Sequence, residues 1–244
     1  MDNAAKIALV TGATRGIGYE TVRGLARAGV RTLLAGRGRG KAEQAARKLQ
    51  DEGLPVEAIE LDVTDEASIA AAADSVAEKF GKLDILVNNA GIMRDAADRK
   101  PSEQSLQAWR ESFDTNLFGL VAVTQAFLPL LHKSSAGRIV NVSSALGSLT
   151  MHSDPGSPIY DYKIPAYSVS KSAVNAWTLH LAYELKDSKM KVNSIHPGYV
   201  KTDMNAGNGD IEVTDGAKTS IAMALLDDIG PNGSYMYMDQ VLPW

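Results

Sequence analysis

The fold is decided near the N-terminus by the stretch IALVTGATRGIG, residues 7–18. Its first four residues, Ile7–Val10, are apolar and predict a short strand that is buried on both faces. Helical spacing of apolar residues follows from about Gly16 to Ala28, and Gly29 ends that helix. The glycines between strand and helix have the spacing G-x-x-x-G-x-G. A tight turn explains them, but in this context they favour a diphosphate site, because glycines let backbone approach phosphates at a helix N-terminus.

The rest of the chain continues the alternation of strands and helices. Further strands are expected at Thr32–Ala35, Val56–Leu61, Ile85–Val87, Arg138–Val142 and Val192–Ile195. Helices are expected at Lys41–Glu52, from an N-cap at Thr64 to Phe80, at Leu106–Leu131 and at Ala166–Leu185. This order predicts the α/β class, with a single doubly wound (Rossmann-type) parallel sheet and helices on both faces.

The chain of 244 residues shows no repeat, no low-complexity segment and no dividing linker. We therefore expect a single dinucleotide-binding domain over residues 1–244. Two segments, about 149–165 and 205–215, are rich in Gly, Pro and polar residues and are expected to be elaborated loops. Loops of such length within a compact domain are usually functional or mobile.

Composition excludes several classes of protein. The chain has no cysteine, so disulfides, thiolate metal sites and cysteine nucleophiles are excluded. A net charge of −4 argues against a nucleic-acid partner. The first residues lack the pattern of a signal peptide, and the apolar run Leu117–Leu131 is shorter than a membrane span, so no membrane partner and a cytoplasmic location are expected.

The end of the second strand bears on the type of cofactor. It reads Leu34-Ala35-Gly36-Arg37 and carries no acidic residue of the kind that bonds the adenosine ribose hydroxyls of NAD(H). Arg15 and Arg37 could both face a 2′-phosphate, which guanidinium groups pair with well. NADP(H) is therefore favoured over NAD(H). The alternative is a solvated helix face made by Arg37, Arg39 and Lys41, and for Arg39 we expect that alternative to hold.

Tyr167 and Lys171 are four residues apart at the start of a predicted helix and therefore lie on one face of it. A nearby cation lowers the pKa of a phenol from its usual value of about 10. A tyrosine tuned in this way can act as a general acid or base. Tyr19 and Arg23 have the same spacing, and we expect them to form a surface pair.

Polar or small residues also end other strands. Ser143 and Ser144 follow the fifth strand, Asn88–Gly91 end the fourth, and His196–Gly198 follow the sixth. Open α/β sheets bind ligands outside the carboxyl ends of their strands, so these residues are predicted to meet the glycine loop at one rim. Turn chemistry could explain each group alone, but not their convergence.

Together these motifs resemble those of the short-chain dehydrogenase/reductase family, from about Lys6 to Ala224. The resemblance rests on TGxxxGIG at 11–18, NNAG at 88–91, Ser144, YxxxK at 167–171 and PG at 197–198. It implies a catalytic set of Asn116 (water relay), Ser144 (carbonyl polarisation), Tyr167 (proton transfer) and Lys171 (ribose binding and tuning of the tyrosine pKa). The implied cofactor-binding residues are Gly12, Thr14, Arg15, Gly16, Ile17, Gly18, Arg37, Asp62, Val63, Asn89, Ala90, Gly91, Tyr167, Lys171, Pro197, Gly198, Val200 and Thr202, and no metal is expected.

Two features depart from the compact family pattern. Ser144 and Tyr167 are 23 positions apart, and this lengthened segment resembles the carbonyl-reductase branch, in which it can interfere with tetramer assembly. Monomer and homo-oligomer both stay open. The residues from Ser234 to Trp244 are expected to form a last strand and a packed tail, or alternatively a tail that closes near the substrate.

The resulting expectation is an NADP(H)-dependent oxidoreductase that interconverts a carbonyl and an alcohol on a small molecule. Apolar pocket residues would be Leu146, Met151, Tyr160, Tyr199 and Met204. One alternative is a 3-oxoacyl-carrier reductase. Another, of a different class, is an NADP(H)-binding sensor or scaffold, which would not need the catalytic set.

Overall fold

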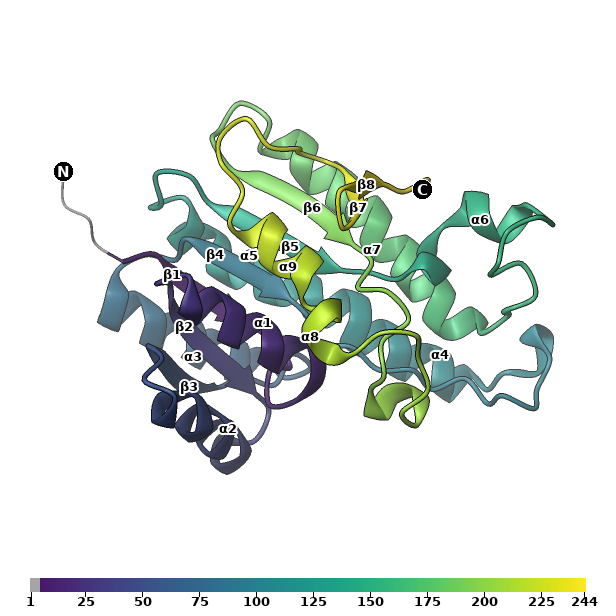
Figure 1. Cartoon of the computed structure of the whole chain (residues 1–244), viewed down its shortest axis with the longest axis horizontal. Coiled ribbons are helices and arrows are strands. Elements are labelled where there is room, and N and C mark those ends of the chain that lie inside the picture. The colour runs from purple at the N-terminus through teal and green to yellow at the C-terminus, as the bar shows by residue number, and fades with distance from the viewer. Residues whose placement is uncertain (1–4) are drawn as a thin grey trace.

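An eight-stranded sheet forms the centre of the computed structural model, which describes residues 5–244 (Figure 1). The first four residues, on which the expectation about a signal peptide partly rests, lie outside the described residues. The strand order is β3-β2-β1-β4-β5-β6-β7-β8, and every pairing is parallel except the short β7–β8 hairpin. The strands are β1 (Ile7–Val10), β2 (Arg31–Gly36), β3 (Val56–Glu60), β4 (Ile85–Asn88), β5 (Arg138–Val142), β6 (Lys191–Ile195), β7 (Tyr235–Tyr237) and β8 (Gln240–Val241).

The strand order of the sheet indicates where a ligand would bind. The chain runs outward from β1 to β3 and then returns to β4 on the other side of β1, so the order reverses between β1 and β4. Ligands of doubly wound sheets bind in the crevice outside the carboxyl ends of the strands at such a reversal. The predicted fold class is confirmed, with an added antiparallel β8 that sequence reasoning did not separate from the last strand.

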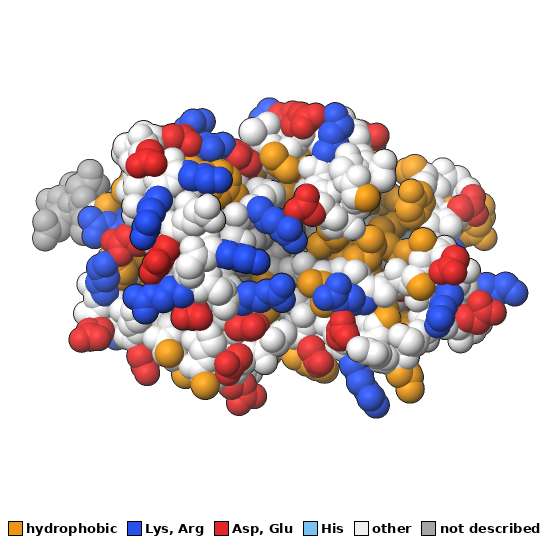
Figure 2. All heavy atoms as spheres, turned by 90° about the horizontal axis from the view of Figure 1, so that it is seen from below, with side chains coloured by type: hydrophobic (Ala, Val, Ile, Leu, Met, Phe, Trp, Pro, Cys, Tyr) orange, Lys and Arg blue, Asp and Glu red, His pale blue; other side chains and the backbone are white. Residues whose placement is uncertain are grey.

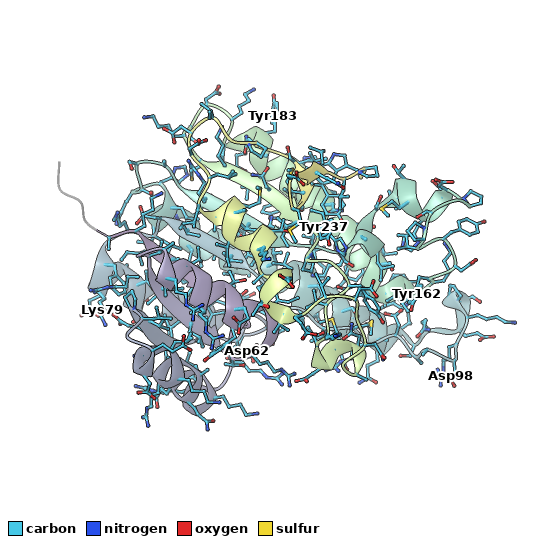
Figure 3. All side chains as sticks on the ribbon, viewed as in Figure 1. Asp62, Lys79, Asp98, Tyr162, Tyr183 and Tyr237 are labelled. Carbon is cyan, nitrogen blue, oxygen red and sulfur yellow. The ribbon has the colours of Figure 1, made fainter. Side chains whose placement is uncertain are left out.

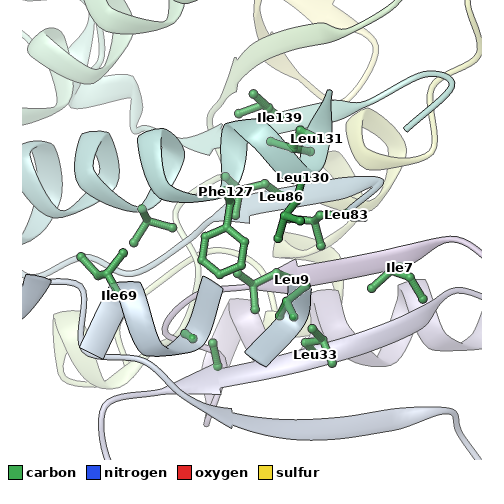
Figure 4. Packing of buried hydrophobic residues seen from close by; sticks show 14 of the residues in the cluster. Ile7, Leu9, Leu33, Ile69, Leu83, Leu86, Phe127, Leu130, Leu131 and Ile139 are labelled. Atoms are coloured by element: carbon green, nitrogen blue, oxygen red, sulfur yellow. The ribbon is translucent and has the colours of Figure 1, made fainter. Parts of the chain in front are cut away.

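Helices cover both faces of the sheet because each strand is apolar on both sides. On one face lie α1 (Gly16–Arg27), α2 (Arg39–Asp51) and α9 (Lys218–Ala224), packed through residues such as Val22, Leu49 and Met223. On the other face lie α3 (Glu66–Phe80), α5 (Gly119–Leu131) and α7 (Pro165–Glu184). Figure 4 shows Phe127 of α5 within this second cluster, among Ile69, Leu9 and Leu86.

The helical segment Leu106–Leu131 is long and apolar enough to cross a membrane, but its C-terminal part, α5, packs in the hydrophobic core against the sheet. It is not uniform. It consists of α4 (Leu106–Phe113), a π-helical turn at Asp114–Phe118 and α5. π-turns within helices occur frequently at functional sites, and this one contains Asn116.

Several predicted boundaries need correction. The N-cap of α3 is Asp65 and not Thr64, because the Asp65 carboxylate accepts from the amides of Ala67 and Ser68. The segments 149–165 and 205–215 are not plain loops. They contain α6 (Leu149–Ser153), the end of a 3₁₀ turn at Asp203–Asn205, a β-bridge between Val200 and Ile211, and the start of α8 (Val213–Gly216). Short 3₁₀ turns also occur at Pro101–Glu103 and Ala145–Gly147.

Candidate active site

The glycine loop packs directly against the residues that follow β4. A Cβ on Gly12 would lie 2.8 Å from Ala90 Cα, and one on Gly18 would lie 2.4 Å from Asn89 Nδ2. The side-chain amide of Asn89 donates to the Thr11 carbonyl at 2.8 Å. The Thr11 hydroxyl accepts from the backbone amides of Asn89 and Ala90. The two motifs therefore hold each other in shape, and only glycine fits at positions 12 and 18.

The N-terminus of α1 is free to bind an anion. Its N-cap residue, Arg15, makes no side-chain capping bond, and no acidic residue lies in the first turn. Gly16 has φ +60°, a left-handed conformation that favours glycine. Helix N-termini with unsatisfied amides attract phosphate groups. The cradle of Gly12, Gly16, Ile17 and Gly18 therefore fits a diphosphate.

A hollow of about 530 Å³ opens beyond the ends of β2 and β3. Arg37 and Asp62 line it, as predicted for the adenosine end of a cofactor, and Thr14, which is not among the lining residues, packs on Gly36 at the end of β2. Arg39 also lines the hollow, paired with Glu43 at 3.0 Å. The Arg39 side chain is nevertheless 78% exposed, so the expectation of a solvated residue is met.

The charge in this hollow is mixed. Its lining also carries carboxylates, from Glu43, Glu60, Asp62 and Asp65. The Asp62 carboxylate is already bonded to the backbone and hydroxyl of Thr64, and Val63 beside it is buried. Within residues 5–244, no carboxylate lies within ion-pair distance of Arg37. Arg37 is thus the exposed cation that is available to an anionic ligand here.

Arg15 and Arg37 are not brought together. The Arg15 guanidinium instead pairs with Asp203 at 2.6 Å, and Arg15 is not among the residues that line the hollow. The pair joins the glycine loop to the loop after β6, and both side chains are mostly exposed. The expectation that both arginines face one phosphate is therefore not met.

Tyr167, Lys171 and Ser144 meet where α7 crosses the end of β5. The Ser144 hydroxyl lies near the Tyr167 phenol, close enough to lower its pKa in part. The ammonium group of Lys171 lies 5.7 Å from the centre of the Tyr167 ring and donates to the Val142 carbonyl at 2.7 Å. Ser143 points away from this group, with its hydroxyl bonded to the Lys171 carbonyl at 3.2 Å. Geometry therefore distinguishes the two serines and favours Ser144 as the one that faces a substrate.

Burial dominates the protonation of this pair. It raises the pKa of Tyr167, and the nearby Ser144 hydroxyl lowers it in part. Burial also lowers the pKa of Lys171 to about 8. The lowering of the tyrosine pKa by Lys171 that the resemblance implies stays a prediction, with the ammonium group 5.7 Å from the ring centre.

Asn116 lies beside Lys171 but does not bond to it. Its side chain accepts from the Ile92 amide at 2.8 Å and donates to the Ile92 carbonyl and the Ser170 hydroxyl. A Cβ on Gly91 would lie 3.4 Å from both Asn116 Oδ1 and Lys171 Nζ. Gly91 therefore lies next to both groups, and Asn116 reaches this position from the π-turn.

Asp95 is a site residue that sequence reasoning missed. Its carboxylate accepts from the amides of Ala166 at 2.8 Å and Tyr167 at 2.9 Å. The N-cap position of α7 is Ile164, which has no polar side chain, so a distant residue caps the helix. No local pattern in the sequence reveals this, because the cap comes from the loop after β4.

The segment after β6 closes the rim. Pro197 and Val200 are buried, and Gly198 has φ +94° and lies against Ile211. The hydroxyl of Thr202, predicted to contact a carboxamide, donates to Asn205 Oδ1 at 3.0 Å. These residues lie at the predicted rim, with Thr202 engaged in a local turn.

Apolar and aromatic side chains gather next to this rim. Figure 2 shows hydrophobic side chains concentrated toward the right of its view, the side on which α4 and α6 lie in Figure 1, and Lys and Arg spread over the left and centre. Tyr160, Tyr199 and Met204 are partly exposed, and the Tyr199 and Tyr162 hydroxyls are hydrogen-bonded. In Figure 3, Tyr162 and Asp62 mark two separate regions along the molecule. The Trp244 carbonyl accepts from the Thr150 amide, so the tail joins β7 to α6.

Replacement of Lys171 by Met is expected to stabilise the fold at pH 7 by about 1–2 kcal/mol. The lowered pKa corresponds to a cost of about 3 kcal/mol for the buried charge, and loss of the bond to Val142 offsets part of the gain. Between pH 8 and 10.5 the unfolded wild type binds more protons than the folded form, so its free energy of unfolding rises with pH relative to the variant.

Urea unfolding at pH 7 and pH 9.5 measures both effects. Lys186→Met, an exposed position just after the same helix, is the control and should change neither. A variant that is less stable than the wild type at pH 7 would contradict the assignment of Lys171 as a costly buried charge.

Three comparisons place the chain among known proteins. The profile of the short chain dehydrogenase family matches residues 6–212. The (+)-neomenthol dehydrogenase of Capsicum annuum is 31% identical, over 98% of this chain and 97% of the relative. The structure of salutaridine reductase from Papaver somniferum matches with a TM-score of 0.83 and 31% identity, over 94% of this chain and 99% of that one. NADPH-bound carbonyl reductase from chicken fatty liver matches with a TM-score of 0.85 and 29% identity, over 98% and 99%.

The chain belongs to the short chain dehydrogenase family and is an oxidoreductase. The expected similarity to carbonyl reductases is confirmed. The alignment with the Capsicum relative extends over 310 positions, more than the 244 residues of this chain, so that relative has segments that are absent here. Within residues 5–244, no group of three His, Asp or Glu side chains is arranged to hold a metal ion.

Proposed function

We propose that this protein is an NADP(H)-dependent reductase of a small apolar ketone or aldehyde, with residues 1–244 acting as one cofactor-binding domain. The observation that carries the proposal is the convergence of Ser144, Tyr167 and Lys171 beside the glycine cradle. Relatives of the chain are reductases and dehydrogenases, and solved relatives hold NADP or NADPH.

The cofactor would lie across the rim from Arg37 to Lys171. The glycine cradle would hold its diphosphate, Arg37 a 2′-phosphate, and Lys171 and Asn89 the sugars. When bound, NADPH supplies the hydride in this family of reactions. The cradle fits such a group because positions 12 and 18 accept no side chain and no side chain caps the N-terminus of α1.

The chain's own residues would handle the substrate oxygen. The Ser144 hydroxyl would donate to the carbonyl oxygen and stabilise its developing charge. Tyr167, kept protonated by burial, would then give its proton to that oxygen. Lys171 would supply positive charge below the phenol as it becomes anionic. The partly exposed Tyr160, Tyr199 and Met204 would form an apolar wall that favours an apolar carbonyl compound.

The direct test is turnover of a panel of ketones, aldehydes and alcohols with NADPH and with NADH. Apolar cyclic ketones with NADPH are expected to react fastest. A 3-oxoacyl thioester as the preferred substrate would favour the carrier-reductase alternative. Tight NADPH binding without turnover of any compound would indicate a sensor or scaffold.

Replacement of Arg37 by Asp should weaken NADPH binding at least ~10-fold and change NADH binding less than ~3-fold. A charge-assisted bond to a phosphate contributes about 1.5–3 kcal/mol, and NADH has no 2′-phosphate to lose it. Titration of cofactor fluorescence gives both dissociation constants. Arg47→Asp, which makes the same charge change on α2 outside the hollow, is the control. Equal losses for both cofactors would remove Arg37 from the phosphate site.

A further inference from the structure

The peptide group between Ser144 and Ala145 is hydrogen-bonded on both sides, by the buried side chain of Tyr235 and the partly buried side chain of His196. Its carbonyl oxygen accepts from the phenol of Tyr235, and its amide donates to Nδ1 of His196 at 3.0 Å. Tyr235 lies on β7 and His196 directly follows β6, so both bonds come from strands that lie later in the chain than β5. None of the sequence motifs assigns either residue to this peptide.

The position of this peptide in the sheet explains the arrangement. The β5–β6 ladder runs to the end of β5, where the Ser143 amide still donates to the Ile195 carbonyl at 2.8 Å. Beyond this point the chain turns away, and the next peptide leaves the ladder. Backbone groups that leave a ladder in a buried place need other partners. The side chains of Tyr235 and His196 take over the two bonds.

Both partners are held firmly and have the right protonation. Tyr235 is fully buried, and its ring stacks on Trp244 with centres 5.5 Å apart. The His196 ring contacts Tyr237 at 5.1 Å. Burial raises the pKa of Tyr235 further above its usual value, and it lowers the pKa of His196 to about 4. At neutral pH Tyr235 therefore keeps its proton to donate, and neutral His196 can accept at Nδ1.

We propose that Tyr235 and His196 are positioning residues that orient the Ser144–Ala145 peptide and thereby keep the Ser144 hydroxyl beside Tyr167. The inference rests on the proposed function, because the position of Ser144 matters only if it meets a reacting oxygen. Displacement of a reacting group by about 1 Å can cost up to ~10²-fold in rate. Groups around a site that lock its side chains are therefore as necessary as the groups that react.

The need of the Ser144 carbonyl for a hydrogen-bond partner does not by itself explain the bond from Tyr235. The Gly147 amide also donates to that carbonyl, at 2.7 Å, so the oxygen keeps a partner when the phenol is removed. The phenol adds a second hydrogen bond to this carbonyl and so restricts the orientation of the peptide plane. His196 adds a further hydrogen bond on the amide side of the same peptide. A positioning residue is expected to make such a bond, which the carbonyl does not need as a hydrogen-bond partner but which restricts the orientation of the peptide.

The first test is Tyr235→Phe, which keeps the ring and its stacking on Trp244 and removes one hydroxyl. We expect kcat to fall ~10-fold and the dissociation constant of NADPH to change less than ~2-fold. Tyr183→Phe, at an exposed position on α7, is the control and should keep the wild-type kcat. A Tyr235→Phe enzyme with wild-type kcat would overturn the proposal.

The second test uses His196 and a conservative rescue. His196→Leu removes the acceptor and is expected to lower kcat ~10-fold, whereas His196→Asn places an amide oxygen near the former Nδ1 and should restore most of the loss. Equal losses in both variants would mean that His196 contributes packing alone, and would contradict its positioning role.

Crystal structures of the wild type and Tyr235→Phe separate this inference from the proposed function. In the variant, the Ser144–Ala145 peptide should rotate, or the Ser144 hydroxyl should leave Tyr167. If the wild type turns over no carbonyl compound, the proposed function fails, and this displacement still tests the positioning. An unmoved peptide in the variant would refute the inference, whatever the activity.

Discussion

Replacement of Tyr167 by Phe is expected to lower kcat by ~10²–10⁴-fold and to leave NADPH binding within ~2-fold of the wild type. The variant keeps the ring, which is almost fully buried, and loses only the hydroxyl that would protonate the substrate oxygen. A positioned general acid typically contributes a factor of this size. Because the hydroxyl is the group proposed to protonate the substrate oxygen, the loss should fall on kcat and spare the cofactor.

Tyr19→Phe is the matched control for this experiment. Tyr19 also has a base four residues later, with the Arg23 guanidinium 5.0 Å from its ring, but it lies on α1 away from the rim. Steady-state turnover and cofactor titration on both variants distinguish a catalytic tyrosine from any tyrosine with that spacing. Tyr167→Phe with a wild-type rate would refute the assignment.

Replacement of Ser144 by Ala should lower kcat by ~10²–10³-fold, as removal of one positioned donor at a developing oxyanion does elsewhere. The same substitution at Ser143 removes a hydroxyl from the preceding residue. That hydroxyl is bonded to the Lys171 carbonyl and does not face the rim. Ser143→Ala should therefore cost less than ~10-fold in kcat.

The pair of serine variants gives a sharp outcome, because the two serines are adjacent and only Ser144 is assigned to the carbonyl by the resemblance and by its position near Tyr167. Rates measured with one ketone and saturating NADPH suffice. If Ser143→Ala has the larger effect, the hydroxyl that polarises the carbonyl comes from the buried serine. The geometry of Tyr167 and Ser144 would then need another explanation.

Much of the fold was predictable because it depends on local chemistry. Runs rich in apolar, β-branched residues such as Ile7–Val10 and Arg138–Val142 favour strands of a sheet covered on both faces, and the structure confirms both strands. Glycines at the ends of α1 and α3 mark where these helices stop, and Gly81 has the expected left-handed conformation. The N-cap of α3 was assigned one residue early because Thr64 and Asp65 are both good caps, and only geometry chooses between them.

Other site residues could not be found from sequence. Asp95 accepts from the Ala166 amide across 71 positions, and the N-cap residue Ile164 gives no sign in the sequence of which residue caps α7. The pairing of Arg15 with Asp203 joins loops 188 positions apart. Such contacts depend on which loops the topology brings together, and no periodicity or spacing along the chain reports that.

By itself, the sequence determined the doubly wound fold, the glycine cradle and the pairing of Tyr167 with Lys171, because each follows from neighbours within a strand, a turn or one helix face. Only the tertiary structure decided which arginine is available to a phosphate and what holds the Ser144–Ala145 peptide. The physical reason is that these depend on bonds between strands and loops far apart in the chain, such as that from Tyr235 to Ser144. Such bonds form only where folding has excluded water from the end of the sheet.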